Sequence, residues 1–139
     1  MFVKQIAVFM ENRKGRICEL TEILGKNGID WLTMSVADTS DFGILRGVTR
    51  DNEKAVRVLR DAGFTVSISD LLGVEVNDKP GGLANILKTL DEKNFSVEYL
   101  YSFAHAAAGK AVILLKTDNA EAALKALKDN GLKIISDLT

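Results

Sequence analysis

Ile68-Ser69-Asp70-Leu71 closes the first half of this chain, and the same four residues return 67 positions later, at 135–138. A period this long that occurs only twice indicates a pair of duplicated small domains, because a solenoid stacks three or more units. Each half alone would bury only about 60% of the surface that its unfolded chain exposes. Each module is therefore expected to gain stability by packing against its twin or against a second subunit, and a homodimer is the default expectation.

Other matching residues in the two halves are separated by nearly the same number of positions. Gly15 and Gly81 each open a helical pattern, and Asp51 and Asp118 each lie in the turn before a second helical pattern. No linker rich in Pro, Gly or Ser separates the halves, so the modules are expected to pack rigidly. The sequence predicts two domains, residues 1–70 and 71–139.

Composition favours a packed globular protein and argues against several classes of function. Of the 139 residues, 47% are hydrophobic and 27% are charged. Eighteen Lys and Arg against nineteen Asp and Glu give a formal charge of −1, so no basic field attracts nucleic acid. No apolar run approaches the roughly 18 residues of a membrane-spanning helix, and the alternation of residues 2–6 differs from a signal peptide. A single cysteine suits a reducing compartment. We expect a cytoplasmic protein that contacts neither membranes nor nucleic acid.

Hydrophobic periodicity gives the same order of elements in both halves. In the first half it predicts a strand over 3–10, a helix between Gly15 and Gly28, strands over 29–37 and 42–49 joined by a turn at 38–41, a helix capped by Asp51, and a strand over 64–69. In the second half it predicts a strand over 72–76, a turn over 77–81 and a helix with apolar positions 83, 86, 87 and 90. Strands over 95–104 and 110–116 follow, then a helix capped by Asp118 with Glu121 three residues on, and a last strand over 132–136. Each module therefore reads as βαββαβ.

The turn Asp78-Lys79-Pro80-Gly81 is the most suggestive feature for function. Proline fixes φ in the turn, and consecutive glycines let a ligand approach the backbone where the first amides of a helix are unpaired. Such a helix start attracts a carboxylate. Asp78, or Asn77 beside it, would accept hydrogen bonds from an α-ammonium group. The alternative is that this segment only forms a tight turn with Asp78 as the helix cap.

The order of the elements, the Asp-x-Pro-Gly turn and the helix start at 82–87 resemble the ACT domain, a regulatory amino-acid-binding module. The resemblance covers the whole chain as a tandem pair. It implies an α+β fold of two ferredoxin-like βαββαβ modules, with antiparallel sheets and helices on one face. It also implies a non-catalytic regulator that binds a small-molecule amino acid and needs no cofactor. The turn at 11–15 departs from the pattern because it lacks both the Asp and the Pro.

In ACT pairs the ligand commonly lies between domains, where it contacts the first turn of one and the second strand of the other. By resemblance, the strands here are 33–38 and 99–104. The latter alternates Tyr99, Tyr101 and Phe103 with smaller residues, and both of its faces carry apolar groups; core packing is the expected role of Tyr99 and Phe103. The candidate ligand-binding residues are Asn12, Arg13, Gly15, Arg16, Asn77, Asp78, Pro80, Gly81, Gly82, Leu83, Tyr101 and Ser102.

The remaining reactive side chains suggest neither catalysis nor a metal site. His105 is the only histidine, and the sequence around it has no cluster with metal-ligand spacing, so we expect an exposed turn residue. Cys18 matches Ala84 in the repeat, which suggests a small packing residue rather than a nucleophile. Arg13 and Arg16 flank Gly15 and would suit an anion, although solvated surface arginines are more common.

The same βαββαβ topology also serves other functions. An RNA-recognition module requires aromatic residues on its central strands, and 42–47 and 110–115 offer almost none. An acylphosphatase-like hydrolase would use an Arg and an Asn in the first turn, which Arg13 and Asn12 faintly resemble, but the rest of that turn is absent. A regulatory subunit that docks on a metabolic enzyme without a ligand stays open as an alternative.

Overall fold

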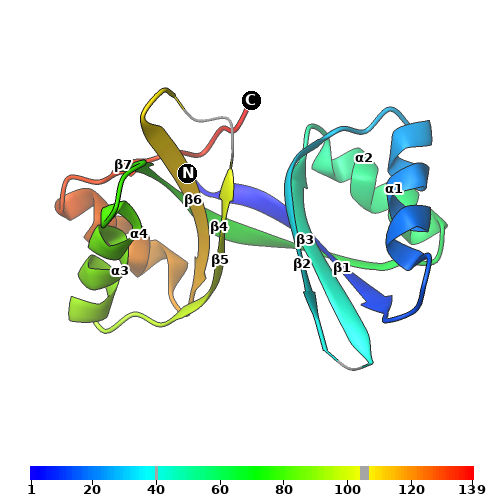
Figure 1. Ribbon diagram of the computed structural model, residues 1–139, viewed down its shortest axis with the longest axis horizontal. Coiled ribbons are helices and arrows are strands. Elements are labelled where there is room, and N and C mark those ends of the chain that lie inside the picture. The colour runs from blue at the N-terminus through cyan, green and yellow to red at the C-terminus, as the bar shows by residue number, and fades with distance from the viewer. Residues whose placement is uncertain (40, 104–106) are drawn as a thin grey trace. The chain divides into compact units, whose positions relative to one another are not determined.

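A computed structural model of the chain describes residues 1–39, 41–103 and 107–139 (Figure 1). His105 and the last residue of the strand expected over 95–104 lie outside the described residues. The elements are β1 (Val3–Glu11), α1 (Arg16–Lys26), β2 (Trp31–Asp38), β3 (Phe42–Thr49), α2 (Asn52–Asp61), β4 (Thr65–Asn77), α3 (Gly82–Glu92), β5 (Val97–Phe103), β6 (Lys110–Thr117), α4 (Ala120–Asp129) and β7 (Lys133–Ile134). This order confirms two tandem ferredoxin-like βαββαβ modules.

The chain divides into two compact units. The first module comprises Lys4–Ser69 with Thr139, and the second comprises Asp70–Leu138 with Met1–Val3. The sheet order is β2-β3-β1-β4 in the first module; in the second, β4 pairs with β6 and β7, and β6 pairs with β5. All pairings with a defined register are antiparallel.

In each module two helices cover one face of the sheet and close a hydrophobic core (Figure 1). The fully buried members of the first core are Ile6, Val8, Leu20, Leu24, Leu45, Ala55 and Leu59. Those of the second are Val74, Ile86, Leu90, Leu115, Ala123 and Leu127. They recur every second residue along the strands and every three or four along the helices, which is the pattern that the sequence indicates. Among the described residues, no helix is both long and apolar enough to cross a bilayer.

β4 corrects the expectation of two separate strands over 64–69 and 72–76. It is one strand of 13 residues that runs from the first module into the second. Its middle stays extended because Leu71 and Leu72 are buried, and because Leu72 already pairs with Leu115 of β6. Residues 70 and 71, which separate the two expected strands, therefore belong to β4.

The cap of α4 is a second correction. Asn119, not Asp118, caps this helix, and its side chain accepts a hydrogen bond from the amide of Ala122. The carboxylate of Asp118 instead accepts a hydrogen bond from the amide of Ser96 at 3.1 Å, which fixes the loop before β5. In the first module Asp51 caps α2, as expected.

The side chains of β5 do not alternate strictly between the two faces of the sheet, whereas the sequence pattern predicts strict alternation. The register with β6 shifts between Val97 and Tyr99, and this irregularity lets both Val97 and Leu100 pack against the helix-covered core. Phe103 is buried, which confirms the packing role expected of it, whereas Tyr99 is only half-buried; neither belongs to the cluster between the sheet and the helices.

Gly73 allows a close backbone approach in the middle of β4. A Cβ at this position would overlap the carbonyl oxygen of Ile135 and lie 3.1 Å from Val3 Cγ2. The Gly73 carbonyl also accepts a hydrogen bond from the Ile135 amide at 2.7 Å. Glycine is thus required here by packing rather than by a turn.

We expect Gly73→Ala to lower the free energy of unfolding by about 1–3 kcal/mol, because the new methyl group must displace the segment after β7. Gly25→Ala is the matched control: it lies in α1 with nothing within 4 Å of the added Cβ, and it should raise stability by roughly 0.5–1 kcal/mol. Urea unfolding of both variants measures the difference. Equal stability of Gly73→Ala and the wild type would contradict the close approach.

Candidate functional site

The turn between β4 and α3 is held by its own backbone. The Asp78 amide donates to the Gly109 carbonyl at 3.0 Å, and the Lys79 amide donates to the Asn77 carbonyl at 2.9 Å. Gly81 has a φ of 87°, a left-handed conformation that favours glycine. A Cβ on Gly82 would overlap the Asn77 carbonyl oxygen, so both glycines are needed for this geometry.

Helix α3 begins without a side-chain cap. Gly81 occupies the cap position, and no side chain bonds the first turn, so the alternative that Asp78 caps the helix is wrong. The first helical bond runs from the Asn85 amide to the Gly81 carbonyl at 3.1 Å. The amides of Leu83 and Ala84 lie in the first turn, where a helix offers no internal acceptor. These donors, with the positive end of the helix dipole, favour a negatively charged group.

A cavity of about 420 Å³ adjoins this helix start. It is lined by Glu75, Val76, Asn77, Lys79, Pro80, Gly81, Gly82, Asn85, Lys110, Gly131, Leu132 and Lys133, all from the second module. We call it the α3 pocket. Four of the expected ligand-binding residues, Asn77, Pro80, Gly81 and Gly82, line it, whereas Asp78 and Leu83 do not.

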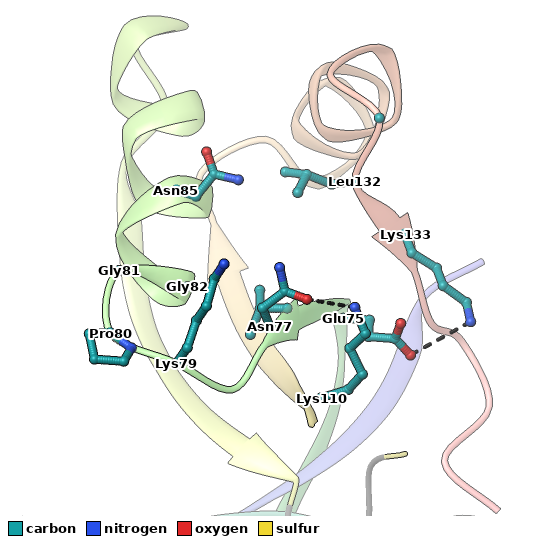
Figure 2. Close-up of a pocket in the computed structure, with 12 residues that line it drawn as sticks. Glu75, Asn77, Lys79, Pro80, Gly81, Gly82, Asn85, Lys110, Leu132 and Lys133 are labelled. Carbon is teal, nitrogen blue, oxygen red and sulfur yellow. Dashed lines mark hydrogen bonds and ion pairs between the residues drawn. The ribbon is translucent and has the colours of Figure 1, made fainter. Parts of the chain in front are cut away.

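Lysines from three segments line the α3 pocket (Figure 2). Lys79 lies in the turn itself. Lys110, at the start of β6, donates to Asn77 Oδ1 at 2.6 Å, and Lys133, in β7, lies 3.6 Å from Glu75 Oε2. The Glu75 side chain is only 17% exposed, so its charge is shielded from solvent more than that of Lys133.

Sequence reasoning missed Glu75, Lys110 and Lys133. They enter the pocket through strand register, because Asn77 pairs with Lys110 across β4 and β6, and Glu75 pairs with Lys133 across β4 and β7. The pattern predicts these strands but not which residues face each other across them. The sequence does carry one signal for two of these residues: Lys110 is the first residue of β6, and Lys133 is the first residue of β7.

The equivalent turn of the first module has a smaller cavity of about 80 Å³. It is lined by Met10, Glu11, Asn12, Arg13, Arg16, Ile17, Val36, Asp38 and Gly43, and we call it the α1 pocket. Gly15 is the cap residue of α1 with a φ of 91°, and again no side chain caps the helix. Of the four candidates in this turn, only Gly15 does not line the pocket.

The comparison with known proteins identifies the family. A family model described as an ACT domain pair matches residues 1–139. The chain belongs to the ACT domain family. No curated protein sequence matches it.

Solved structures agree with this assignment. Protein BT0572 of Bacteroides thetaiotaomicron is 36% identical, with a TM-score of 0.91 over 99% of this chain and 96% of that chain. The regulatory subunit of aspartate kinase from Thermus thermophilus is 14% identical, with a TM-score of 0.66 over 92% of this chain and 93% of that chain. Its counterpart from Thermus flavus is 16% identical, with a TM-score of 0.64 over 93% and 92%. The last two likenesses show a shared fold.

In the first ACT module, Arg16 is a partly buried side chain rather than a solvated arginine. Its guanidinium lies 4.0 Å from the ring centroid of Phe64, and Nη1 pairs with Glu19 Oε2 at 3.0 Å. Its Nε is buried and, within the described part of the chain, has no hydrogen-bond partner. Arg13 instead stays exposed and pairs with Glu11 at 3.2 Å. Asn12 ties the turn to the β2–β3 hairpin, donating from Nδ2 to the Thr39 carbonyl.

Tyr101 and Ser102 lie on β5, opposite Leu114 and Ile113 of β6. Tyr101 is half-buried and Ser102 is exposed. Neither lines the α1 pocket or the α3 pocket. Among the residues that the structure describes, no three His, Cys, Asp or Glu side chains come together as a metal site.

Cys18 is exposed, so its expected packing role is wrong. Its thiol donates to Glu22 Oε1 at 3.5 Å. This hydrogen bond, and then the charge of Glu22, raise the pKa of the thiol.

Glu22→Ala should lower the pKa of Cys18 and speed its alkylation by iodoacetamide at pH 8, because more thiolate is present at that pH. Glu92→Ala, which removes the same charge from α3, serves as the control and should leave the rate unchanged. A Glu22→Ala protein that alkylates at the wild-type rate would contradict the role of this carboxylate.

Proposed function

We propose that this ACT pair is a non-catalytic regulatory protein that binds an amino acid in the α3 pocket and reports its level. The observation that carries the proposal is an uncapped helix start beside a cavity of about 420 Å³ with convergent polar groups. Pockets for small molecules commonly occupy about 300–1,000 Å³. The size therefore suits a free amino acid.

The groups around the α3 pocket match both ends of a zwitterion. The α-carboxylate would lie at the start of α3, where Gly81 and Gly82 line the pocket and where the first turn of a helix favours an anion. At the other side, the Glu75 carboxylate is an acceptor for an α-ammonium group, since it lines the pocket and is largely shielded from solvent. Asn77 contributes its side-chain oxygen, which Lys110 already contacts. This assignment replaces Asp78, which does not line the pocket, with Glu75.

Regulation requires that the ligand bind two arrangements of the protein with different affinity. We propose that ligand in the α3 pocket changes the pairing of the modules within a homodimer, or a contact with a metabolic enzyme. Proteins of this fold include regulatory subunits of aspartate kinase, which supports a regulatory role for the fold. The position of the ligand between modules, which the family resemblance implies, stays a prediction.

Gly81→Asp should abolish amino-acid binding, because a carboxylate at the cap position would occupy the first amides of α3 and repel the ligand. Gly63→Asp is the matched control: Gly63 also has a left-handed backbone with open space around the added Cβ, and it lies in neither pocket. Isothermal titration calorimetry against the twenty amino acids measures binding. At least one amino acid should saturate the wild type and Gly63→Asp, but not Gly81→Asp.

A folded wild-type protein that binds none of the twenty would overturn the proposal. Co-purification of a stoichiometric enzyme whose binding ignores amino acids would instead favour a ligand-independent regulatory subunit. Release of phosphate from an acyl phosphate would favour the hydrolase, although Arg13, its candidate phosphate ligand, is already paired with Glu11.

A further inference from the structure

We propose that the α3 pocket selects an amino acid that carries a second acidic group, such as a side-chain carboxylate. This inference rests on the proposed function, namely that the pocket holds an amino acid. It goes further by assigning the ligand a net negative charge. The argument depends on the charges that line the pocket and on their partners.

The lining residues have an excess of positive charge. Among the described residues that line the pocket, Lys79, Lys110 and Lys133 accompany a single carboxylate, Glu75. A zwitterion with a neutral side chain adds no net charge, so it would leave two cations uncompensated beside the positive end of α3. Asp78, the nearest other carboxylate in the turn, does not line the pocket. A ligand with a second acidic group lowers this excess.

The partners of the lysines also leave room for an anion. Lys110 contacts a neutral amide oxygen, Asn77 Oδ1, so its charge has no counter-charge in this contact. Lys133 lies 3.6 Å from Glu75, a long separation for an ion pair, and its side chain is 67% exposed. An ammonium has three donors, so both lysines can bind an acidic group while they keep their present contacts.

The first module lacks this excess, although its turn has the same backbone form. Two arginines, Arg13 and Arg16, line the α1 pocket together with two carboxylates, Glu11 and Asp38. Arg13 pairs with Glu11 at 3.2 Å, and Arg16 pairs with Glu19 at 3.0 Å. The excess of positive charge therefore comes from the side chains of the second module and not from the backbone fold that both modules share. We accordingly assign the selectivity for an acidic ligand to the α3 pocket.

Calorimetry with matched ligands tests the proposal. L-aspartate and L-glutamate are compared with L-asparagine and L-glutamine, which have nearly the same shape without the second charge, at low salt because exposed charges are screened. The acidic member of each pair should bind at least about tenfold more tightly, which corresponds to roughly 1.4 kcal/mol. Lys110→Gln and Lys133→Gln should each reduce this preference while leaving the affinity for the amide ligand nearly unchanged. Lys93→Gln, which removes the same charge at the other end of α3, should preserve the preference.

The outcomes separate this inference from the proposed function. If a neutral amino acid binds as tightly as its acidic counterpart, or if Lys110→Gln and Lys133→Gln weaken both ligands equally, the charge selectivity is wrong and the amino-acid site stands. If no amino acid binds the folded protein, both are wrong. A preference for the acidic ligand that both lysine variants reduce supports the proposal.

Discussion

The second module depends on β4 having a partner on each side. β6 pairs with one edge of this strand and β7 with the other, and these pairings fix which side chains meet at its end. Lys110 is thereby brought to Asn77, and Lys133 to Glu75. The chain then turns over Gly81 into α3, whose first amides open beside the same residues. Packing thus assembles a polar pocket from segments more than 50 residues apart in the sequence.

The two modules show how one fold can hold different sites. Each begins its first helix at a left-handed glycine without a side-chain cap. In the first module the surroundings are compact, with Arg16 laid over Phe64 and a cavity of about 80 Å³. In the second the surroundings are wider and rich in lysine. The shared backbone supplies the helix start, and the unlike side chains around it determine what can bind there. Duplication of one module, followed by substitution of the residues that line its pocket, accounts for the difference between the two sites.

Much of the fold can be predicted from periodicity, because the cores recur at strand and helix spacing and glycines mark the helix ends. The predictions fail where local signals compete. The pattern predicts separate strands over 64–69 and 72–76, yet the burial of Leu71 and Leu72 keeps β4 continuous. Asp118 suggests a cap, yet its carboxylate bonds Ser96 and leaves the cap to Asn119.

The turn at 77–82 could likewise be predicted from Pro80, Gly81 and Gly82. Glu75, Lys110 and Lys133 could not, because register depends on tertiary pairing and sequence shows only the strands. Asp78 illustrates the reverse error: it carries the right chemistry, but it does not line the pocket.

The most direct measurement of the central claim is amide chemical-shift mapping of the labelled protein during titration with L-aspartate or L-glutamate. The account predicts saturable shifts at Gly81 and Gly82, which line the α3 pocket at the start of α3, and little change at Gly15 and Arg16, the matching positions at the start of α1. Saturable binding that moves the α1 amides and leaves those of α3 unchanged would contradict it.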